Sequence, residues 1–263
     1  MQEADDFFAE SEALAGLVNE LPDLSITTQF KSWRIVDVLG HLAIWNEAAS
    51  LTYRDPSAFA TFIENMMANF QSGGTLRDYE ARLLTNLTDD EIRDRWWASA
   101  VDTYQCYADV DPKHRVAWGG PAMSVRSCIS ARLMETWAHA QAIYDVVGRV
   151  RVDTDRLRHI VMLGLNTIGF NFSVHGDSPP DIVPTLILEA PSGETWTFGD
   201  LDTNECIQGT ATEFCQVVTQ VRHIADTELA VSGPIATRWM AIAQCFAGPA
   251  TTPPAPGSRF RIN

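Results

Sequence analysis

The sequence is poor in basic residues. Its 263 residues include 19 Lys and Arg against 34 Asp and Glu, for a formal net charge of −15 at pH 7. A surface this acidic repels phosphate backbones, which argues against nucleic acid as a partner. Long apolar runs are also missing, since the most apolar stretch, residues 160–172, is too short and too broken to span a membrane. The N-terminal MQEADDFFAESE has no basic region followed by an apolar segment, so we expect no secretory signal.

Paired cysteines and the common nucleotide or hydrolase motifs are absent as well. The five cysteines are scattered and form no C-x-x-C pair, so we expect reduced thiols that fill apolar space in a cytoplasmic protein. No glycine-rich phosphate loop follows a predicted strand, and no G-x-S-x-G is found. What the chain does have is 46% hydrophobic residues, enough for one large or two modest cores.

Helical periodicity dominates the first 170 or so residues, and a mixed pattern follows. The predicted helices cover 3–20, 33–52, 56–71, 75–86, 88–107, 121–147 and 153–171. After a turn-rich segment that begins at His175, we expect strands at 185–191, 194–200 and 227–233 and helices at 210–224 and 234–248. The sequence therefore predicts a helical domain at 1–176 and a small α+β domain at 177–263.

Two separated motifs carry the candidate chemistry. His41 lies in WRIVDVLGHLAIWNEAA, and Glu135 and His139 lie four residues apart in ARLMETWAHAQAIYD, on one face of a predicted helix. Two imidazoles and one carboxylate form a ligand set for a divalent metal that leaves coordination positions open for chemistry. Spacing alone leaves a second interpretation open, because a Glu and a His four residues apart are commonly a solvated pair on a helix.

The surroundings of His41 can be interpreted in two ways. Asp37, one turn earlier, could accept the distal ring proton of His41 and fix its tautomer, or it could be a surface acid. Trp33, Trp45 and Trp137 could wall a water-poor pocket or simply pack in the core.

The chain resembles a known family over almost its whole length. The two motif runs, extended to RVAWGGPAMSVRSCISARLMETWAHAQ, and the C-terminal GTATEFCQVVTQVRHIADTELAVSGPIATRWMAIAQCFAGP are similar to actinobacterial relatives of mycothiol-dependent maleylpyruvate isomerase. The resemblance implies a DinB-like four-helix bundle followed by a sterol-carrier-like α+β domain. It also implies that His41, Glu135 and His139 bind zinc, with nickel as the alternative. Arg222 then matches an arginine that helps to bind an anionic substrate, although it could also be an exposed cation at a helix end.

The chain departs from the family at two positions. Typical relatives carry an acid near Asn46 and near Ala142, where this chain has an amide and a methyl group. Neutral drift around the metal would explain the change, and so would remodelled proton transfer or substrate contacts. We therefore expect Asn46, like Asp37, to lie in the shell of residues around the metal ligands.

Three functions remain open from the sequence. The first is a metal-dependent isomerase or S-transferase in which a metal-held thiolate, with mycothiol as co-substrate, adds to an activated electrophile. The second is a thiol-independent isomerase, cyclase or hydrolase that uses the metal as a Lewis acid. The third is a non-catalytic protein that binds a small molecule. For the enzymes we expect a small anionic or carbonyl-containing substrate and a monomer or homodimer.

Overall fold

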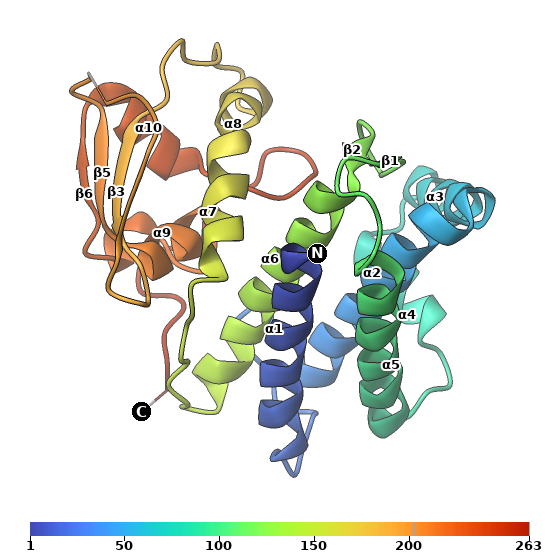
Figure 1. The fold of residues 1–263 in the computed structure, drawn as a ribbon. Coiled ribbons are helices and arrows are strands. Elements are labelled where there is room, and N and C mark those ends of the chain that lie inside the picture. Colours follow the sequence, from blue (N-terminus) through green and yellow to red (C-terminus); the bar gives the residue numbers. More distant parts are fainter. Residues whose placement is uncertain (202, 263) are drawn as a thin grey trace. The chain divides into compact units, whose positions relative to one another are not determined.

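The chain forms two compact units, Met1–Ala140 and Gln141–Asn263, in a computed structural model that describes residues 1–201 and 203–262 (Figure 1). A helical N-terminal region precedes a small C-terminal domain with a mixed sheet, which confirms the predicted fold class. The boundary that we placed at residue 176 stays a prediction. Among the described residues, no helix is both long enough and apolar enough to cross a membrane.

Four long helices of the first unit share one apolar core. The helices that begin in this unit are α1 (Gln2–Asn19), α2 (Ile35–Arg54), α3 (Pro56–Gln71), α4 (Leu76–Leu83), α5 (Asp89–Tyr107) and α6 (Val125–Val146). Phe7 from α1, Ala49 from α2, Tyr107 from α5 and Ile129 from α6 belong to the same buried cluster. The packing of α6 against α1, α2 and α5 fixes the helix that carries Glu135 and His139.

Local sequence signals set several helix ends. The side chain of Thr88 accepts a hydrogen bond from the Glu91 N–H, and the Glu91 carboxylate accepts one from the Thr88 N–H, so the predicted capping box is confirmed. The helix predicted to begin at residue 121 begins instead at Val125. The short strands β1 (Arg115–Val116) and β2 (Met123–Ser124) pair immediately before it, an element that the sequence analysis missed.

The helix predicted over 153–171 is interrupted. It consists of α7 (Leu157–Asn166) and α8 (Ile168–Val174). Thr167 separates the two helices, and its hydroxyl donates back to the carbonyl oxygens of Leu163 and Gly164. This hydroxyl bonding competes with continued helical hydrogen bonding, which is how Thr perturbs a helix.

The second unit contains a four-stranded sheet in the order β4-β3-β5-β6. The remaining elements are β3 (Thr185–Glu189), β4 (Thr195–Phe198), β5 (Cys206–Thr210), α9 (Ala211–Val218), the 3-10 helix η1 (Ile224–Asp226), β6 (Ala230–Ser232) and α10 (Pro234–Ile242). β3 pairs antiparallel with β4 and parallel with β5, and β5 pairs antiparallel with β6. Leu186 and Leu188 are fully buried on one face of the sheet, as the alternation of a half-buried strand requires.

Three predictions for the second unit were wrong in detail. The sequence analysis missed β5, because CIQGT contains Gln and Gly and ends in Thr210, the N-cap of α9. The helix predicted over 210–224 ends at Val218. The last helix ends at Ile242 rather than at residue 248.

Candidate metal centre

The donor atoms of His41, Glu135 and His139 converge within the first unit. One ligand atom from each residue lies within 4.8 Å of the other two. The Nε2 atoms of His41 and His139 are 3.6 Å and 3.1 Å from the same carboxylate oxygen, Oε2 of Glu135. Two imidazole nitrogens and one carboxylate oxygen form a donor set that suits zinc and related divalent ions, so these residues fit a metal.

Glu80 orients His41. This carboxylate on α4 is fully buried, and its Oε1 lies 2.7 Å from His41 Nδ1 and accepts a second hydrogen bond, at 3.0 Å, from the indole of Trp45. With Nδ1 held by Glu80, the His41 Nε2 atom faces Glu135. A carboxylate behind a ligating histidine fixes the ring orientation and makes the imidazole a better donor.

Asp37 does not make this contact. Of the two interpretations of Asp37, the one that paired it with His41 is wrong, because Glu80 makes that contact. Asp37 itself accepts from the Arg34 backbone and guanidinium and pairs with Arg77 at 2.7 Å. As the third residue of α2, Asp37 completes a capping box at the start of the helix, which keeps its carboxylate away from the His41 ring.

The electrostatics of the metal-free centre favour the protonated, imidazolium form of His41. Burial lowers the pKa of His41, but the hydrogen bonds and charges of Glu135 and Glu80 outweigh burial and raise this pKa to about 9. Burial lowers the pKa of His139, so its ring is neutral at pH 7. Burial also opposes ionisation of Glu135, yet hydrogen bonds from His139 and His41 bring its pKa well below the usual value.

Aromatic rings surround the two histidines. The Trp33 ring stacks parallel to His139 at 6.0 Å and lies 5.4 Å from His41, and Phe30 meets His139 edge-on at 4.8 Å. Phe30 and Trp33 flank a tight turn whose central residues, Lys31 and Ser32, have φ values of 50° and 57°. This left-handed backbone is costly for residues other than glycine, and such strain is concentrated at functional sites.

The tryptophans predicted near the site serve different roles. The Arg77 guanidinium lies over the Trp33 ring, 4.9 Å from its centroid. Because Arg77 also pairs with Asp37, this salt bridge helps to hold the Trp33 ring in place. Trp45 binds Glu80 as described, whereas Trp137 is fully buried in the core.

Asn46 contacts none of the three candidate ligands in the described structure. It is fully buried, donates to Ser99 Oγ at 3.4 Å and accepts from Arg132 Nε at 3.1 Å. Arg132 is on α6, one turn before Glu135, and is only 2% exposed. The sequence analysis did not single out Arg132 or Glu80.

Arg222 is already paired within the second unit. Its Nη2 lies 2.7 Å from Oδ1 of Asp145, and both side chains are largely buried. Asp145 also accepts from Gln141. The predicted role of Arg222 in binding an anion stays a prediction, and the salt bridge means that such an anion would compete with Asp145 for the guanidinium. Ala142 lies on α6 three residues before Asp145.

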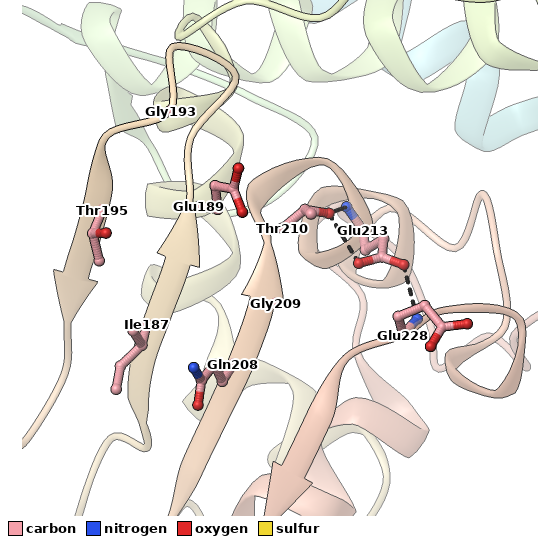
Figure 2. Close-up of a pocket in the computed structure, with 9 residues that line it drawn as sticks. All are labelled: Ile187, Glu189, Gly193, Thr195, Gln208, Gly209, Thr210, Glu213 and Glu228. Carbon is pink, nitrogen blue, oxygen red and sulfur yellow. Dashed lines mark hydrogen bonds between the residues drawn. The ribbon is translucent and has the colours of Figure 1, made fainter.

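A separate hollow of about 450 Å³ lies on the second unit's sheet (Figure 2). Its lining residues are Ile187, Glu189, Gly193, Thr195, Gln208, Gly209, Thr210, Glu213 and Glu228. Both oxygens of Glu213 accept local hydrogen bonds, one from the Thr210 hydroxyl and one from the Glu228 N–H. The described lining brings together no histidine, cysteine or basic residue, so the His41 centre is the better candidate for chemistry.

Known proteins resemble this chain over most of its length. A family model described as the mycothiol maleylpyruvate isomerase N-terminal domain matches residues 7–144, which contain all three candidate ligands. Uncharacterized proteins from two Mycobacterium tuberculosis strains, CDC 1551 / Oshkosh and H37Rv, are each 36% identical over 247 residues, covering 93% of this chain and 95% of the relative.

Solved structures share the fold. The crystal structure of the mycothiol-dependent maleylpyruvate isomerase matches with a TM-score of 0.51 and 14% identity, covering 82% of this chain and 87% of that chain. A mutant of that isomerase matches with a TM-score of 0.52 and 13% identity over the same shares. At these identities the likeness concerns the fold alone.

Proposed function

The chain belongs to the mycothiol maleylpyruvate isomerase N-terminal domain family, and from this we propose that it is a metal-dependent isomerase or S-transferase that uses a low-molecular-weight thiol. The observation that carries the proposal is the convergence of His41, Glu135 and His139 donor atoms within 4.8 Å. Zinc is our first choice of metal and nickel the alternative. We place the enzyme in the cytoplasm, as a monomer or homodimer, with mycothiol as co-substrate.

The residues around the centre have separable roles in this proposal. A divalent ion held by His41, Glu135 and His139 would supply a Lewis acid that keeps a bound thiol as its thiolate. Glu80 holds the proton on Nδ1 of His41, so that Nε2 is the donor atom. Phe30 and Trp33 cover the two imidazole rings with apolar surface and restrict water there.

Arg222 is our candidate for binding an anionic group of the substrate. Such an interaction binds the anionic group in the ground state and in the transition state alike, so Arg222→Ala should raise the KM for an anionic substrate more than it lowers kcat. An equal effect on an uncharged substrate analogue would contradict this role.

Metal analysis and an assay with thiol test the main proposal. Purified protein should contain about one zinc or nickel ion per chain, and His41→Ala and Glu135→Gln should lose that ion while keeping their helical circular dichroism. Incubation with mycothiol and a cis-enoate analogue should give isomerised product or a thioether adduct by mass spectrometry. Metal-loaded protein that gives neither product would refute the thiol chemistry.

A second function is a thiol-independent Lewis-acid enzyme acting on a carbonyl compound. The observation that favours it is the side chain of Asn46, which is an amide committed to Arg132 and Ser99 and offers no acid for proton transfer. Turnover of a carbonyl substrate without added thiol would support it. A purified protein without stoichiometric metal would instead support a non-catalytic binding protein.

A further inference from the structure

Arg132 is a buried cation without a matching anion. It is 2% exposed, its Nε donates to the neutral side chain of Asn46, and its Nη2 is buried with no hydrogen-bond partner among the described residues. The part of the chain that the structure describes places no carboxylate in a salt bridge with it. A guanidinium stays protonated even when buried, so the charge persists.

Other arginines of the first unit have carboxylate partners. Arg77 pairs with Asp37, and Arg95 pairs with Glu47. An uncompensated buried charge is costly, and replacing the neutral partner Asn46 with an acid would remove most of that cost. The lack of an acid at this position therefore leaves one positive charge beside the metal ligands.

Arg132 changes the net charge of the metal-loaded centre. Two carboxylates face the centre, those of Glu135 and Glu80, and they balance the two charges of a divalent ion when both histidines are neutral. Arg132 lies one helical turn from Glu135 on the same helix, and it adds one further positive charge. The loaded centre then lacks one negative charge, which is what a single monoanionic ligand supplies.

We propose that Arg132 is a specificity-determining residue of the metal centre, whose unpaired charge favours a monoanion such as a thiolate over a neutral molecule as the additional metal ligand. This inference rests on metal binding as proposed above and deepens it. Arg132 acts through the field at the centre and not by touching the ligand. Asn46 contributes to this specificity, because its side chain binds the Arg132 guanidinium without neutralising the charge.

The test compares a charged and an uncharged ligand on cobalt-loaded, full-length protein. Visible absorption titrations at fixed pH would give the dissociation constants of azide, a monoanion, and of imidazole, which is neutral. In Arg132→Met, azide should bind about tenfold more weakly, the order expected for removing one unit charge from a partly shielded interior, while imidazole changes less than twofold. Arg132→Lys should keep most of the azide affinity.

Asn46→Asp tests the same charge without removing Arg132. The new carboxylate gives the guanidinium a counter-ion, so azide affinity should again fall about tenfold while the Tm rises. A purely structural role for Arg132 predicts instead that azide and imidazole affinities fall together and follow the Tm. Equal changes for both ligands, or unchanged azide affinity in both variants, would overturn the proposal while leaving metal binding intact. Wild-type protein that binds no cobalt would overturn both the inference and the metal-dependent function.

Discussion

Metal binding to this protein should release about one proton at pH 7. In the metal-free centre, Glu135 and Glu80 outweigh burial and raise the pKa of His41 to about 9, so its ring is an imidazolium at neutral pH. A metal ligand must be a neutral imidazole, and the ion therefore has to displace that proton. Burial lowers the pKa of His139, and Glu135 is ionised, so neither of them adds to the release.

The size of the effect follows from the distance between the pH and this pKa. At pH 7, roughly two units below the pKa, about 1% of His41 is neutral, which weakens apparent metal affinity about 100-fold, or about 2.7 kcal/mol. The affinity should therefore rise about tenfold per pH unit from pH 6.5 to 8.5. Calorimetric titration with zinc in buffers of different ionisation enthalpy gives the proton count, and competition with a chromophoric chelator gives the affinity.

Two variants separate this mechanism from a general charge effect. Glu80→Gln removes one of the two carboxylates that raise the pKa of His41, so fewer protons should be released and the pH dependence should move to lower pH. Asp102→Asn removes an exposed carboxylate that pairs with Arg54, and it should change neither quantity. Zinc affinity that stays flat from pH 6.5 to 8.5, or a proton count that Glu80→Gln leaves unchanged, would refute the reasoning.

Three further predictions concern stability. Metal-free protein should lose up to about 3 kcal/mol of unfolding free energy as pH rises. The raised pKa of His41 stabilises the folded state fully below about pH 6.5, and this stabilisation is lost as the pH passes about 9. Urea unfolding at pH 6 and at pH 9.5 measures the difference. Thr88→Ala should cost about 1 kcal/mol through loss of the cap of α5, whereas Thr61→Ala, on an exposed helix position, should cost less. Ser32→Gly should stabilise the turn by about 0.5–1 kcal/mol because φ is 57° there, and a lower Tm would contradict it.

Periodicity was a good guide to the helices and a poor guide to short elements. α1, α2, α3 and α5 lie where the apolar spacing and the caps predicted them, because each helix is long enough to show a buried stripe. The hairpin β1–β2 and the strand β5 were missed, since a few residues carry no period and their pairing partners are distant or depend on a turn.

The candidate ligands were readable from sequence, but the residues that tune them were not. Glu135 and His139 are neighbours on one helix, so spacing predicted their proximity, and the family resemblance added His41. Glu80 lies 39 residues from His41 in a short charged helix, and nothing local shows that this one carboxylate turns inward. Arg132 looks like any helical arginine until burial beside Asn46 shows that it has no counter-ion.

The location of the three candidate ligands also bears on the stability of the chain. His41 is on α2 and Glu135 is on α6, so an ion bound to both closes a loop of roughly 90 residues that includes α3, α4 and α5. Such an ion is a removable cross-link, which penalises the unfolded chain in the way a disulfide does. Removing the metal with a chelator should then make the helical unit more sensitive to proteases, whatever the activity of the protein. The supply of metal would in that case control how long the protein survives proteolysis.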